Sequence, residues 1–108
     1  MAAARGADHA EAYTWAMSHT TERPCARPDV VFRRLADDEW ALFDPVAHRV
    51  HALNLAAAIV WEHCDGALDV AGIAETVRSS FTPAPSTIDD DVRAVLQRLT
   101  DEGLVTWT

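Results

Sequence analysis

Three short apolar segments follow one another between residues 30 and 53, and only three or four residues separate each from the next. The segments are Val30–Leu35, Glu39–Asp44 and Arg49–Leu53. Apolar runs of this length, bounded by turn residues such as Asp and Pro, predict β-strands, and connections this short join antiparallel neighbours. The sequence therefore predicts a three-stranded antiparallel meander. A sheet this small needs helices on one face to be stable.

The sequence after the meander supplies those helices. Asn54 is a good N-cap for a first helix over LAAAIVWEHC, and Asp65-Gly66 ends it. Asp69 caps a second helix, in which apolar residues recur at helical spacing as far as Phe81. The segment TPAPST then breaks that helix.

A third helix is expected to begin at Ser86 or Thr87 and to stop at Gly103. The acids Asp89–Asp91 lie in its first turn, where they stabilise the positive end of the helix dipole, and we interpret them in that role rather than as ligands. The tail Leu104–Trp107 fits a further short strand. The predicted fold class is α+β, of winged helix-turn-helix type, with three strands followed by three helices.

The N-terminal residues differ from the rest of the chain. Residues 1–27 show no sustained periodicity of apolar residues. They end in RPCARP, whose prolines stop a helix. We expect a disordered extension over residues 1–27, in which Asp8–Met17 forms a short helix only against a partner, and one folded domain over residues 28–108. From Pro28 onward there are six Arg and fourteen acidic residues, so this domain carries the whole net charge of −8. Such a surface repels nucleic acids and anionic membranes.

The chain also lacks the signals of secretion and membrane insertion. No apolar run approaches the ~18 residues of a membrane span, and the first residues contain no apolar signal-peptide core. Cys25 and Cys64 lie far apart in the sequence, and we expect both to be reduced thiols. These observations predict a cytoplasmic protein.

Catalytic and metal-binding patterns are missing as well. The histidines and cysteines have neither the C-x-x-C nor the H-x-x-x-H spacing of a zinc site, and no phosphate-binding loop occurs. His63 and Cys64 are neighbours on a helix, so their side chains point about 100° apart and cannot act as a base and a nucleophile. We predict no enzymatic activity, no metal and no cofactor.

Five segments in a fixed order resemble the PqqD-like family, whose members are also called RiPP recognition elements. The segments are PDVVFRR, WALFDPVAHRVHALN, AAAIVWEHCDG, DVAGIAETV and DVRAVLQRLTDEGLV. The stretch that contains them, Pro28–Val105, covers about three quarters of the chain, and the most specific feature is the helix with Trp61 between LN and DG. The long N-terminal extension departs from the family pattern.

The resemblance implies a protein that binds the leader segment of a ribosomally made precursor peptide. The leader would lie as an added strand along the third strand, in a groove walled by the third helix. The strand residues are Arg49, Val50, His51, Ala52 and Leu53, and the helix flank consists of Asp91, Val95, Arg98 and Glu102. The family partner that then modifies the peptide is a radical SAM protein, a leader peptidase or another maturation enzyme.

The sequence leaves two alternative functions open. A DNA-binding winged helix has the same fold, although three acids at the start of the third helix and the charge of the domain oppose it. A structural subunit of a maturation complex, which docks to an enzyme without touching the peptide, is compatible with every pattern above.

Overall fold

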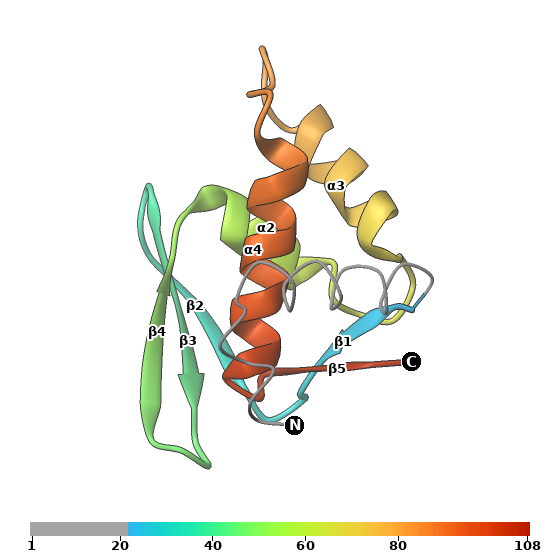
Figure 1. The fold of residues 1–108 in the computed structure, drawn as a ribbon. Helices are drawn as coiled ribbons and strands as arrows, with labels where there is room; N and C mark the ends of the chain where they lie inside the picture. Colours follow the sequence, from blue (N-terminus) through green and yellow to red (C-terminus); the bar gives the residue numbers. More distant parts are fainter. Residues whose placement is uncertain (1–21) are drawn as a thin grey trace, which may run out of the picture.

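The computed structural model describes residues 22–108, and the structural statements below concern these residues. Three antiparallel strands form a sheet in the order β2-β3-β4, with bounds Val31–Ala36, Glu39–Asp44 and Arg49–Leu53. Three helices follow, α2 (Leu55–Glu62), α3 (Val70–Ser79) and α4 (Ile88–Asp101), and they lie together on one side of the sheet (Figure 1). The predicted fold class is confirmed. The disorder and the conditional helix expected before residue 22 lie outside the described residues.

A second, two-stranded sheet joins the two ends of the described chain. Strand β1 (Pro24–Ala26) pairs antiparallel with β5 (Val105–Trp107). The N–H of Ala26 also donates to the carbonyl of Cys64 at 2.7 Å. The folded domain therefore begins before Pro28, earlier than the sequence predicted. A three-residue strand is too short to show the alternation of apolar and polar residues that identifies strands. The residues that pair with it also lie at the opposite end of the sequence.

Local signals account for where the helices begin and end. The side-chain oxygens of Asn54 and Asp69 each accept from the backbone N–H three residues ahead, both at 2.9 Å, and so cap α2 and α3 as predicted. Gly103 follows α4 with a φ of +73°, in the left-handed region that favours glycine. Within residues 22–108, no helix has both the length and the apolar character needed to cross a bilayer.

The core lies between the sheet and the helices. Every second residue of the strands points into it, as the pleat requires. In β4, His51 and Leu53 are buried, whereas Val50 and Ala52 are exposed. The buried cluster that they face includes Leu42, Val60, Ile73, Val77, Val92, Leu96 and Leu99. This alternation sets which side of β4 looks toward the helices.

A buried carboxylate ties the meander to the β1 segment. Asp44 accepts two bonds from the guanidinium of Arg27, at 3.0 and 3.2 Å, and further bonds from the N–H groups of Val46 and Ala47. The bonds from Arg27, and then those from the two backbone groups, hold the pKa of Asp44 below its ordinary value. The turn that leads into β4 is therefore anchored on a charged, fully bonded side chain.

Candidate functional site

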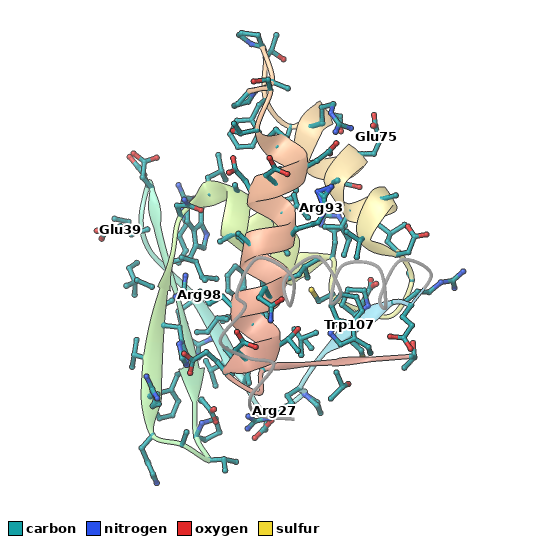
Figure 2. The ribbon with its side chains drawn as sticks, in the orientation of Figure 1. Arg27, Glu39, Glu75, Arg93, Arg98 and Trp107 are labelled. Atoms are coloured by element: carbon teal, nitrogen blue, oxygen red, sulfur yellow. The ribbon has the colours of Figure 1, made fainter. Side chains whose placement is uncertain are left out.

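Strand β4 is an edge strand with a helix beside it. Within the described residues it pairs with β3 alone, so its other backbone edge has no strand partner. Helix α4 packs mainly on α2, α3 and β5. Its C-terminal half nevertheless reaches toward β4 through side chains, and Figure 2 shows Arg98 extending from α4 in that direction.

Arg98 shows which backbone groups of β4 point outward. Its guanidinium donates to the carbonyl of Ala52 at 2.9 Å, from the side of α4 rather than of β3. In an antiparallel pair, the N–H and C=O of one residue point to the same side, and successive residues alternate. Ala52 and Val50 therefore direct their backbone groups away from β3. The backbone groups of His51 point toward β3, and so do those of the terminal residues Arg49 and Leu53.

A second contact joins the same two elements. The guanidinium of Arg49 lies 3.8 Å from a carboxylate oxygen of Glu102. Both side chains keep contact with solvent, so this ion pair is weak. Glu102 and Arg98 are four residues apart and share one flank of α4. The predicted flank thus meets β4 at Arg49 and at Ala52.

The other two predicted helix residues are engaged elsewhere. Val95 is half-buried and packs against the core cluster. Asp91 accepts a hydrogen bond from the hydroxyl of Thr87 at 3.0 Å, in the first turn of α4. The structure therefore brings Arg98 and Glu102 to the strand edge, but it shows no contact of Asp91 with β4 among the described residues.

Arginines accompany the remaining acids of that first turn. Asp89 pairs with Arg78 of α3, and Asp90 lies 3.4 Å from Arg93. The predicted role of the acids as stabilisers of the helix start stays a prediction.

His51 has a property that the sequence does not reveal. Its side chain is only 7% exposed, and its Nε2 atom has no hydrogen-bond partner within the described residues. On the sequence alone, only the backbone of His51 is expected to take part in binding. A buried, unpartnered imidazole nitrogen can be recognised only from the packing around it.

The structure also describes the two residues that most resemble catalytic groups. The Nδ1 atom of His63 bonds the carbonyl of Ile59 at 2.9 Å, and the thiol of Cys64 donates to the carbonyl of Val60 at 3.2 Å. Burial raises the pKa of the Cys64 thiol to about 12, which disfavours the nucleophilic thiolate. No group of three or more His, Cys, Asp or Glu side chains between residues 22 and 108 is arranged to hold a metal ion.

Fold and edge together define a class of protein. The domain is winged-helix-like, and its candidate site is an open strand edge beside a helix flank, which is the arrangement used to add an extended peptide as a further strand.

Comparison with known proteins identifies the family of the chain. Residues 39–105 match the family described as coenzyme PQQ synthesis protein D (PqqD), and the chain belongs to this family. It is 37% identical over 67 residues to the PqqA binding protein of Rhodopseudomonas palustris strain CGA009. It is 38% identical over 77 residues to the PqqA binding protein of strain TIE-1.

These matches cover part of each protein. The first covers 62% of this chain and 64% of that relative, and the second covers 68% and 74%. Among solved structures, the chain resembles "TbiB1 in Complex with the TbiA(beta) Leader Peptide" with a TM-score of 0.61 and 18% identity, over 75% of this chain and 93% of that one. This last likeness concerns the fold. The comparisons give no support to the DNA-binding alternative.

Proposed function

We propose that this protein binds the leader segment of a ribosomally synthesised precursor peptide and presents it to a separate modifying enzyme. The observation that carries the proposal is the edge of β4 that has no strand partner among the described residues, where Val50 and Ala52 direct backbone groups toward the flank of α4. The names of the relatives, PqqA binding proteins, support the same function.

Backbone pairing and side chains would contribute differently to binding. An extended peptide beside β4 would exchange hydrogen bonds with Val50 and Ala52, which gives affinity with little dependence on sequence. Arg98, Glu102 and Val95 on α4 would then select among peptides by charge and shape. Because the domain carries an excess of acidic residues, we expect leaders with basic residues around the paired segment.

Arg98 has a second role in this proposal. Exposed strand edges invite pairing with other chains, and proteins protect them with charged side chains. In the free protein, the guanidinium of Arg98 donates a hydrogen bond to the carbonyl of Ala52. An incoming peptide N–H would replace it there, so the contact protects the edge without blocking it permanently.

The chemistry on the peptide would belong to the partner enzyme, such as a radical SAM protein or a leader peptidase. We propose that this chain is itself no enzyme and acts in the cytoplasm without metal or cofactor. The backbone contacts of His63 and the buried thiol of Cys64 support this part of the proposal. Stoichiometric zinc or iron in the purified, untagged protein would contradict it.

Amide shift mapping tests the placement of the peptide. The ¹⁵N-labelled protein is titrated with the N-terminal half of the precursor encoded beside its gene, and with the PqqA peptide of R. palustris as a second probe. We expect the largest changes in β4 and in the C-terminal half of α4. Changes confined to α2 or to residues before Pro28, with β4 and α4 silent, would refute the placement.

A further inference from the structure

Beside the edge of β4, within residues 22–108, helix α4 places a cation that has no carboxylate partner. Arg27, Arg78 and Arg93 each bond at least one Asp or Glu. Arg98 instead bonds a neutral backbone carbonyl and has no carboxylate partner within the described residues. Glu102, which directly follows α4, forms a weak ion pair with Arg49. The local charges of that pair cancel, so the positive charge of Arg98 remains.

The unpartnered Nε2 of His51 lies in the same part of the molecule. His51 precedes Ala52, and its ring projects from β4 toward the helices, the side from which Arg98 arrives. A buried polar atom without a partner costs stability, and folded proteins seldom retain one without a function or a bound molecule to satisfy it. The cationic group, which is bonded to Ala52, and the unpartnered imidazole nitrogen of His51 are thus associated with two consecutive residues of β4.

An added strand would place one peptide side chain at these two groups. Residues in register on neighbouring strands point to the same face of a sheet, whichever way the strands run. The peptide residue in register with His51 therefore projects toward α4. Val50 and Ala52, on either side of His51, supply the backbone hydrogen bonds that fix this register.

We propose that Arg98 and His51 form a subsite for one acidic side chain of the leader, carried by the residue in register with His51. The inference rests on the proposed function. When a peptide N–H takes over the carbonyl of Ala52, the guanidinium is released and pairs with the carboxylate, as charge-assisted bonds between Arg and carboxylate favour. In the Nε2–H tautomer, His51 donates to the same carboxylate. A preferred leader therefore has basic residues around a single acid.

Selection from a random peptide library tests this directly. A phage library of random twelve-residue peptides is selected on the wild-type protein, on Arg98→Glu and on Arg33→Glu. Arg33 is the matched control, because it is an exposed arginine on β2 whose side chain also bonds a backbone carbonyl. We expect one acidic position in the wild-type motif, a basic residue at that position with Arg98→Glu, and the wild-type motif with Arg33→Glu.

Synthetic peptides then measure the size of the effect. A selected peptide is made with Glu and with Gln at the acidic position, and binding is followed by fluorescence anisotropy. The change to Gln should weaken binding to the wild type roughly tenfold, or about 1.4 kcal/mol. The same change in the peptide should alter binding to the Arg98→Gln variant by less than about twofold, because that variant has already lost the pairing between Arg98 and the acidic side chain. With His51→Phe, which keeps a ring in the core, the penalty should fall between these values.

The outcomes separate this inference from the proposed function. Peptides that bind at β4 without an acidic preference, or whose acidic position persists with Arg98→Glu, would overturn the subsite and leave the proposed function standing. A wild-type selection that enriches no peptide at all, together with no shifts from the precursor, would refute both.

Discussion

The two outer strands of the sheet, β2 and β4, each have one edge without a strand partner among the described residues, yet their edges are protected in different ways. On β2, the register with β3 shifts between Arg34 and Ala36, which marks a bulge or irregularity. The side chain of Arg33 bonds the carbonyl of Phe32 at 3.3 Å, and that of Arg34 bonds the carbonyl of Ala36 at 3.2 Å. This edge is therefore protected by residues of the strand itself.

Strand β4 has no such protection of its own. It pairs with β3 in an unbroken register from Asp44↔Arg49 to Trp40↔Leu53. Its outward carbonyl at Ala52 is covered by Arg98, which lies 46 residues away on α4. A side chain from another element can move aside when a ligand arrives, and it can then contact that ligand. This difference favours β4 over β2 as the edge that would pair with a peptide.

The largest effect should come from disturbing the inner side of β4. His51→Pro removes an N–H that points toward β3, and it leaves a carbonyl of the ladder without its donor. We expect the free energy of unfolding to fall by about 2 kcal/mol or more, measured by urea denaturation. A variant as stable as the wild type would show that this N–H faces outward, and the assigned alternation along β4 would then be wrong.

A proline on the outer side should instead affect binding. Ala52→Pro removes an N–H that points away from β3 and keeps the carbonyl, so leader binding should weaken tenfold or more. Each tenfold loss of affinity corresponds to ~1.4 kcal/mol of binding free energy. Isothermal titration with the precursor peptide measures the change, and circular dichroism verifies the fold.

The matched control for this variant lies on the other edge. Arg34→Pro removes an N–H of β2 that points away from β3, by the same alternation of backbone groups. Leader affinity should stay within about twofold of the wild type. If Arg34→Pro weakened binding as much as Ala52→Pro, the peptide would not distinguish the two edges.

Removing the arginines of β2 should expose that edge to other copies of the chain. In the double variant Arg33→Ser/Arg34→Ser, the carbonyls of Phe32 and Ala36 lose their side-chain donors. We expect weak, concentration-dependent self-association in sedimentation velocity, with leader affinity little changed. A variant that stays monomeric at high concentration would show that the irregular register alone protects β2.

The smallest effect concerns the ion pair between β4 and α4. Arg49 and Glu102 are 3.8 Å apart and in contact with solvent, and such pairs contribute ~0.2–1 kcal/mol. Glu102→Gln should therefore change the free energy of unfolding by less than about 0.5 kcal/mol, and raising the salt concentration should remove even that difference. A larger loss that persists in high salt would mean that Glu102 has a structural role beyond this pair.

Much of the fold could be predicted because its signals are local. The bounds of β3 and β4 and the caps at Asn54 and Asp69 agree with the prediction, since turn residues and side-chain caps act within a few positions along the chain. Strand β2 begins one residue later than predicted. The pairing of β1 with β5 escaped prediction, because neither three-residue strand has a period and their partners lie at opposite ends of the domain.

For the candidate site, the sequence predicted the participants through the resemblance to the PqqD-like family. The alternation of β4 and the helical spacing of Arg98 and Glu102 place them on one strand and on one flank of one helix. Only the tertiary structure decided that the guanidinium of Arg98 covers the carbonyl of Ala52 and that the Nε2 of His51 is buried without a partner. Both features depend on how α4 packs across the core, which is set by contacts between distant residues that local periodicity does not encode.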